Sequence, residues 1–144
     1  MEKKLLLGAE AIALGALDAG ISGVYAYPGT PSTEITEYIQ KNSNRSSQLI
    51  RSSWSVNEKT AYEEALGMSY AGKRSLVCMK HVGLNVAADA FINSAITGVN
   101  GGLVIAVADD HPASEYNGEF VLTDEEAERL RDDPRIWDVH RDPC

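Results

Sequence analysis

A loop with the sequence Tyr-Pro-Gly-Thr-Pro-Ser at residues 27–32 joins an apolar run to a helical pattern and could hold an anion. Its backbone N–H groups and the hydroxyls of Thr30 and Ser32 are donors of the kind that bind carboxylate or phosphate where a helix begins. A capped turn built from ordinary glycine and proline chemistry accounts for the same residues. The loop by itself therefore leaves both a ligand site and a structural turn open.

Two further segments carry ionisable side chains beside predicted strand ends. Glu58 stands at the start of a helical pattern, where the helix dipole stabilises a carboxylate and where the group could also take part in proton transfer. Lys80 and His81 follow an apolar run and could supply a positive charge or a proton donor, although a structural role fits a single histidine equally well. The adjacent residues 109–111 (Asp-Asp-His) cannot all face one ion, so no metal site is expected.

The elements that must position these groups follow from the hydropathy pattern, which alternates helices with apolar runs. Continuous apolar runs between helices predict a mostly parallel sheet covered on both faces, in a three-layer α-β-α fold. In such a sheet the loops that follow the strands meet at one edge, where ligands bind. Helices are expected at residues 8–19, 30–40, 57–71 and 86–96, and strands at 24–27, 48–54, 75–79 and 103–108.

Local signals refine two of these helices. Thr30 or Ser32 is expected to cap the second helix with its hydroxyl. Residues 81–85 are expected to form a loop or the start of the fourth helix, and residues 41–47 are expected to form a polar loop. These details decide which side chains remain available to a ligand.

The composition describes an acidic globular chain of 144 residues with a net charge of −8. Such a charge argues against nucleic acid as a partner. Residues 121–144 hold eight acids and four arginines, so we expect a domain at 1–120 and an acidic tail at 121–144 that forms a short helix and irregular structure. No apolar stretch reaches transmembrane length, and the apolar run after Lys4 stops after three leucines, so we expect no membrane anchor and a cytoplasmic location.

Five ordered blocks of the sequence together resemble a known family. The blocks are GAEAIALGALDAG at 8–20, YAYPGTPSTEI at 25–35, WSVNEKTAYEEALGMSYAG at 54–72, MKHVGLNVAAD at 79–89 and GVNGGLVIAVADD at 98–110. They resemble the N-terminal, pyrimidine-binding (PYR) domain of thiamine-diphosphate-dependent 2-oxoacid:ferredoxin oxidoreductases, and within that family the alpha subunit of the indolepyruvate branch. The resemblance implies a PYR-type fold, apparently truncated, since the pattern fades after Asp110.

The resemblance implies a reaction and a set of site residues. Such enzymes oxidatively decarboxylate a 2-oxoacid, here an arylpyruvate such as indolepyruvate, to acyl-CoA with ferredoxin as electron acceptor. Glu58 matches the catalytic glutamate that hydrogen-bonds the aminopyrimidine ring of thiamine diphosphate. The remaining implied residues are His81, Gly83 and Asn85 beside the cofactor, and Thr30, Pro31 and Ser32 near the substrate carboxylate.

The chain lacks other parts that the family's reaction needs. It contains no GDG motif, which holds magnesium beside the diphosphate in the family, and no cysteine motif for an iron–sulfur cluster. Magnesium and the clusters are therefore expected only through partner domains, and the chain is not expected to be active alone. We expect it to pair with a diphosphate-binding domain or subunit, and in isolation to form a homo-oligomer through small-residue surfaces around Gly67, Ala71 and residues 85–88.

Two other functions remain open on the sequence. Non-oxidative decarboxylases of the sulfopyruvate type use a short pyrimidine-domain alpha subunit whose length is nearer to that of this chain, although the block MKHVGLN favours the oxidoreductase. A non-catalytic remnant of the fold, or an interaction module, is favoured by the unmatched tail and disfavoured by the retention of Glu58 and the loop at 27–32.

Overall fold

The computed structural model describes residues 5–45 and 49–109, so the predicted boundary at residue 120 and the acidic tail lie outside the described residues. None of the described helices is long and apolar enough to cross a membrane. The predicted alternation of helices and strands is confirmed. The elements are α1 (Gly8–Asp18), β1 (Gly23–Ala26), α2 (Thr33–Asn42), the 3-10 turn η1 (Ser43–Arg45), β2 (Arg51–Trp54), α3 (Glu58–Tyr70), β3 (Ser75–Lys80), α4 (His81–Thr97) and β4 (Leu103–Ala108).

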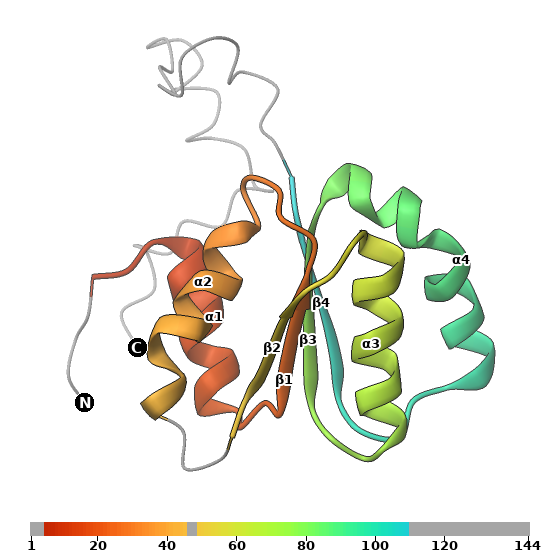
Figure 1. The fold of residues 1–144 in the computed structure, drawn as a ribbon, viewed down its shortest axis with the longest axis horizontal. Coiled ribbons are helices and arrows are strands. Elements are labelled where there is room, and N and C mark those ends of the chain that lie inside the picture. Colours follow the sequence, from red (N-terminus) through yellow and green to blue (C-terminus); the bar gives the residue numbers. More distant parts are fainter. Residues whose placement is uncertain (1–4, 46–48, 110–144) are drawn as a thin grey trace, which may run out of the picture. The chain divides into compact units, whose positions relative to one another are not determined.

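The four strands form one sheet in the order β2-β1-β3-β4, and every neighbouring pair is parallel. Helices α1 and α2 lie on one face of this sheet, and α3 and α4 lie on the other (Figure 1). The predicted three-layer α-β-α fold is therefore confirmed. Ala26 at the end of β1 pairs with Trp54 of β2 and with Cys78 of β3, so the loops that follow these strands emerge at the same edge. We call this the carboxyl edge.

The core consists of two apolar layers separated by the central strands β1 and β3. Val24 and Cys78 face α1 and α2, whereas Tyr25 and Val77 face α3 and α4. Alternate side chains of a strand point to opposite faces, so a strand between two helical layers must be apolar throughout. Cys78 is buried as predicted, and burial raises the pKa of its thiol to about 12.

Strand β4 departs from the prediction that the sheet is covered on both faces. It is the most apolar strand in the sequence, yet it lies at the edge of the described sheet, with exposed fractions of 60% for Val104 and 40% for Val107. On one face α4 packs mainly against α3 and covers little of β4, and on the other face an apolar hollow lies between α1 and Val104. Apolar surface on β4 therefore remains open on both faces within the described part of the chain.

Other local expectations had mixed outcomes. Of the loop and the helix start expected at 81–85, the structure shows the helix start, because α4 begins at His81 directly after β3. The expected polar loop at 41–47 is shorter, because α2 continues through Asn42. The predicted hydroxyl cap of α2 is absent, since Ser32 precedes the helix but donates its hydroxyl to the Gly29 carbonyl at 2.8 Å. The Ser32 hydroxyl, which was predicted to cap the helix, is therefore used within the loop.

Gly101 offers a test of how closely the chain packs before β4. A Cβ at this position would lie 2.7 Å from the Lys73 backbone nitrogen and closer still to the Lys73 carbonyl oxygen, whereas a Cβ at Gly102 would meet only the flexible Arg74 side chain at 3.5 Å. We expect Gly101→Ala to lower the free energy of unfolding by about 2 kcal/mol or more. Gly102→Ala is the matched control and should change it by less than about 1 kcal/mol. Urea denaturation followed by circular dichroism measures both, and equal effects would contradict the packing described.

Candidate functional site

Glu58 is held at the carboxyl edge by the connection between β2 and α3. The Ser55 backbone N–H donates to the Ala26 carbonyl at 2.8 Å, which ties this connection to the end of β1. The Asn57 side chain then accepts a hydrogen bond from the Thr60 backbone N–H at 2.8 Å and caps α3. Glu58 is consequently the first residue of α3, where the helix dipole stabilises its carboxylate.

The Glu58 side chain lies against the first turn of α4, where the facing residue is a glycine. Glu58 has an exposed fraction of only 7%, and Gly83 is buried. A Cβ at Gly83 would lie 2.6 Å from Glu58 Cγ and 2.8 Å from Oε1, so no larger residue fits without displacing the carboxyl group. Among the described residues, the hydrogen bonds found include none from another side chain to this carboxylate. The structure therefore brings together two predicted site residues, Glu58 and Gly83, around a buried carboxylate.

His81 and Asn85 lie on a different side of α4 from Gly83. They are one helical turn apart and share a face, whereas Gly83 points away from that face because successive residues are rotated by about 100°. Both are exposed, and His81 Nδ1 lies 3.1 Å from Asp109 Oδ1 at the end of β4. The sequence did not predict this pair, although both residues directly follow strands that proved to be neighbours. Of the three residues expected beside the cofactor, only Gly83 contacts Glu58.

The loop at 27–32 is organised around Gly29. The Gly29 carbonyl accepts the Ser32 hydroxyl at 2.8 Å, and the Gly29 N–H donates to Thr33 Oγ1 at 2.9 Å. Ser32 is buried, Pro31 is half-buried behind a cis peptide bond, and Thr30 is exposed. Of the two hydroxyls predicted to meet a substrate, the one on Thr30 is accessible and the one on Ser32 is used by the loop.

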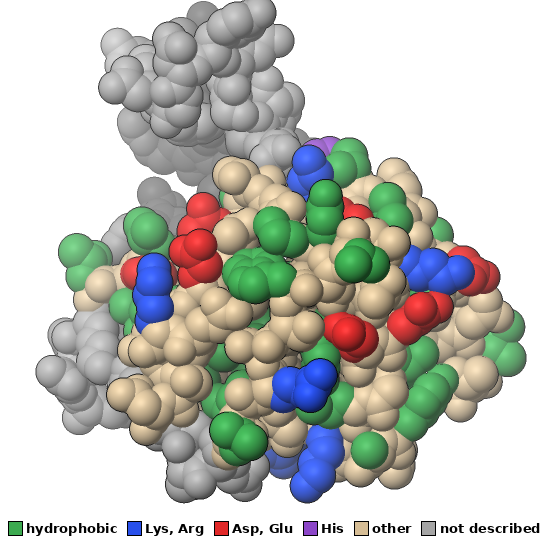
Figure 2. Space-filling view, in the orientation of Figure 1, with side chains coloured by type: hydrophobic (Ala, Val, Ile, Leu, Met, Phe, Trp, Pro, Cys, Tyr) green, Lys and Arg blue, Asp and Glu red, His purple; other side chains and the backbone are tan. Residues whose placement is uncertain are grey.

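Large apolar side chains are exposed at the same edge. Tyr27 is 41% exposed and Trp54 is 39% exposed, and each lies where a strand ends, while Val56 in the connection to α3 is 81% exposed. Figure 2 shows hydrophobic side chains gathered over the loops that follow β1 and β2, next to basic side chains at the upper edge. Exposed aromatic groups beside a buried carboxylate suit a flat organic ring or the apolar surface of a partner domain.

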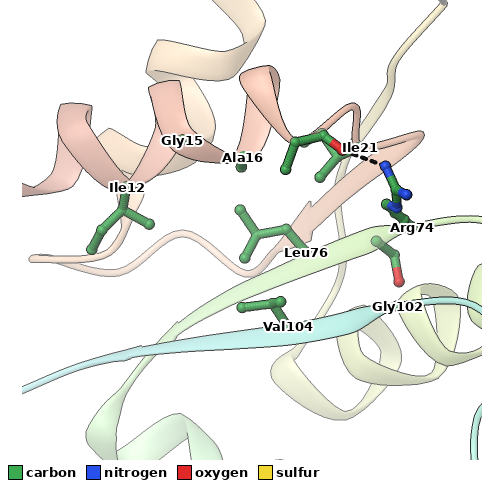
Figure 3. Close-up of a pocket in the computed structure, with 10 residues that line it drawn as sticks. Ile12, Gly15, Ala16, Ile21, Arg74, Leu76, Gly102 and Val104 are labelled. Carbon is green, nitrogen blue, oxygen red and sulfur yellow. Dashed lines mark hydrogen bonds between the residues drawn. The ribbon is translucent and has the colours of Figure 1, made fainter.

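A hollow in the described part lies away from this edge and is lined mainly by apolar surface. It has a volume of about 280 Å³ and lies between α1 and strands β3 and β4. Ile12 and Ala16 of α1 face Leu76 and Val104 across it, and Arg74 at one end donates to the Ala19 carbonyl at 2.6 Å (Figure 3). The hollow is lined by apolar surface and lies over the face of β4 that is incompletely covered. It is not part of the carboxyl edge.

Known proteins similar to this chain are indolepyruvate oxidoreductase subunits. No family model matches the chain. The indolepyruvate oxidoreductase subunit IorA of Pyrococcus abyssi is 51% identical over 109 residues, and that of Archaeoglobus fulgidus is 50% identical over 111 residues; each match covers 76% of this chain. The chain spans only 16% and 18% of those two relatives. A solved 2-oxoglutarate:ferredoxin oxidoreductase from Magnetococcus marinus has the same fold, with a TM-score of 0.65 and 24% identity over 76% of this chain and 18% of that one.

The fold defines the class of the described part: it is an α/β domain of the kind found in 2-oxoacid:ferredoxin oxidoreductases. Within that class, the chain is related to the indolepyruvate oxidoreductase subunit IorA and corresponds to about one sixth of its length. The resemblance predicted from the five sequence blocks is thereby confirmed.

The contact between Glu58 and Gly83 predicts that alanine substitutions at two helical glycines change the free energy of unfolding in opposite directions. An alanine stabilises a helix by about 1 kcal/mol relative to glycine. Gly67→Ala should show this gain because a Cβ there meets nothing within 4 Å, whereas Gly83→Ala should lower the free energy of unfolding by about 1–3 kcal/mol by overpacking the carboxyl group. Urea denaturation of both variants measures the two signs, and a gain at both positions would contradict the contact.

Proposed function

We propose that the described domain is the pyrimidine-binding half of a thiamine-diphosphate site. The observation that carries this proposal is the buried Glu58 carboxylate at the start of α3, with a glycine opposite it in the first turn of α4. A carboxylate buried in this way, with access to a ligand, suits a hydrogen bond to a heterocyclic nitrogen. The cofactor would supply the electron sink that decarboxylation of a 2-oxoacid requires.

The residues around Glu58 fit an aminopyrimidine ring. Glu58 would share a proton with a ring nitrogen, and Gly83 would keep the carboxyl group in place by leaving it room. Tyr27 and Trp54 expose aromatic surface at the same edge, where a flat ring or the second half of the site would cover them. His81 and Asn85, which face away from Gly83, would contact more distant parts of the cofactor or the partner domain.

We propose that the whole enzyme oxidatively decarboxylates an arylpyruvate such as indolepyruvate, forming acyl-CoA and reducing ferredoxin. Support comes from the names of the relatives, which are indolepyruvate oxidoreductase subunits, and from a structural neighbour that is a ferredoxin oxidoreductase. Because the chain has no GDG motif and no cysteine motif, partner domains would provide the magnesium site, the diphosphate site and the iron–sulfur clusters. A cytoplasmic location is part of the proposal and rests on the sequence.

Complementation of a truncated relative tests this function. The chain would be co-expressed with Pyrococcus abyssi IorA from which the matched segment has been removed, together with the other components of that enzyme. We expect the wild-type chain to restore indolepyruvate-dependent, thiamine-diphosphate-dependent reduction of methyl viologen. Glu58→Gln keeps the shape of the side chain but cannot exchange its proton in the same way, so it should lower the rate by about 100-fold or more.

Glu63→Gln is the matched control for that experiment. Glu63 lies on the same helix, is exposed, and makes only a long ion pair of 4.0 Å with Lys59, so the control should restore activity as well as the wild type does. Full activity with Glu58→Gln would contradict the proposed role. Failure of a folded wild-type chain to restore any activity would contradict the proposed function.

We also propose that the isolated chain self-associates through the outer face of α4. Ile92 is 60% exposed and Ile96, one helical turn further along, is 81% exposed, and Figure 2 shows hydrophobic side chains over this helix. The sequence pointed to the small residues at 85–88, but Ala87 is buried within the domain itself. The larger apolar side chains of α4 therefore form the stronger candidate surface.

Sedimentation velocity at micromolar concentration tests this association. The wild-type chain is expected to sediment as a dimer or larger species. Ile92→Glu with Ile96→Glu should shift it to the monomer, because charged side chains oppose burial of the face. Leu5→Glu removes a fully exposed apolar side chain away from α4 and should leave the assembly unchanged. A monomeric wild-type chain would refute the proposal.

A further inference from the structure

We propose that Lys80 binds the carboxylate of the 2-oxoacid substrate. This inference deepens the proposed function and rests on it, because a substrate carboxylate must lie near the ring that Glu58 holds. Nothing in the sequence resemblance assigns a role to Lys80. The inference comes from the position of its side chain and from the state of the other basic groups at the carboxyl edge.

Lys80 links the three parts of the candidate site. It is the last residue of β3 and the residue on which α4 begins, three positions before Gly83. Its aliphatic stem passes beside Gly29, since a Cβ at that glycine would lie 3.5 Å from Lys80 Cδ and 3.9 Å from Cε. The side chain therefore runs along the loop at 27–32, whose exposed Thr30 was predicted to meet the same carboxylate.

The other basic side chains at this edge are already paired. Lys59 Nζ lies 2.7 Å from Asp89 Oδ2, and this hydrogen bond raises the pKa of Lys59. His81 Nδ1 lies 3.1 Å from Asp109 Oδ1. Within residues 5–45 and 49–109, the ion pairs found include none with Lys80. Among the described residues, Lys80 is thus the cation at this edge that remains available to an anion.

The local electrostatics also favour an anion beside Lys80. A lysine at the start of a helix faces the positive end of the helix dipole, and the first turn of α4 contains no acidic residue. A carboxylate bound between the Lys80 ammonium and the first turn of α4 would be stabilised by both, through a charge-assisted hydrogen bond to the ammonium. Glu58, which is buried, is engaged with the ring in the proposed site.

Titration of the full chain by amide NMR tests the assignment with three probes: phenylpyruvate, its neutral analogue phenylacetone, and inorganic pyrophosphate. We expect phenylpyruvate to shift the resonances of Gly29, Thr30 and His81, with phenylacetone binding much more weakly. Lys80→Gln should weaken phenylpyruvate binding by about tenfold or more, and Lys80→Arg should restore most of it. Lys73→Gln, at the opposite edge of the sheet, is the matched control and should bind as the wild type does.

Three outcomes would overturn the assignment. The first is equal binding of phenylpyruvate to the wild type and to Lys80→Gln, and the second is the absence of phenylpyruvate binding to the wild type. The third is that Lys80→Gln weakens the binding of pyrophosphate alone, which would make Lys80 a diphosphate contact. In the complemented enzyme, the KM for the 2-oxoacid should rise about tenfold in Lys80→Gln, with a smaller change in kcat and an unchanged requirement for thiamine diphosphate. Since the wild-type and Glu58→Gln results do not depend on Lys80, failure here is distinguishable from failure of the proposed function.

Discussion

The contact between the Glu58 carboxylate and Gly83 is the constraint on which the candidate site depends. It brings together the starts of two helices that are far apart in the sequence, because a buried carboxylate occupies the space where α4 lacks a side chain. A methyl group at position 83 would have to move either the acid or the helix. The absence of a side chain at Gly83 therefore fixes the position of α4 relative to Glu58, the residue proposed to hold the cofactor. The positions of Lys80 and His81 at the start of α4 depend on the same contact.

The parallel sheet makes that contact possible. Because β1, β2 and β3 run in the same direction, the loop at 27–32, the start of α3 and the start of α4 all emerge at one edge. The same architecture leaves other surfaces incomplete: β4 is only partly covered, and α4 presents apolar side chains to solvent. A domain with an uncovered site and uncovered apolar faces is suited to function against other domains, in agreement with the small share of its relatives that it spans.

Much of the fold was predictable, and the exceptions have identifiable causes. Within the part of the chain that the structure describes, periodicity located the four α-helices and the four strands, because each element buries an apolar face. It did not show that α4 begins directly at His81, since residues 81–85 contain a glycine and an asparagine that are also typical of loops. It did not show that Ser32 would be used by Gly29 rather than by the helix, because a hydroxyl can satisfy either partner. It overestimated the coverage of β4, since an apolar run does not reveal whether a strand is central or at an edge.

The sequence by itself determined the class of fold, the apolar strands and the family, because apolar periodicity and five ordered blocks are local properties of the chain. It also placed Glu58 at the start of a helix. Only the tertiary structure decided which neighbours meet. Glu58 lies against Gly83, while Asn85 faces away. Asp109 pairs with His81, and Asp89 pairs with Lys59, so that neither acid pairs with Lys80. The physical reason is that these contacts join residues tens of positions apart, and their partners are set by strand order and helix rotation.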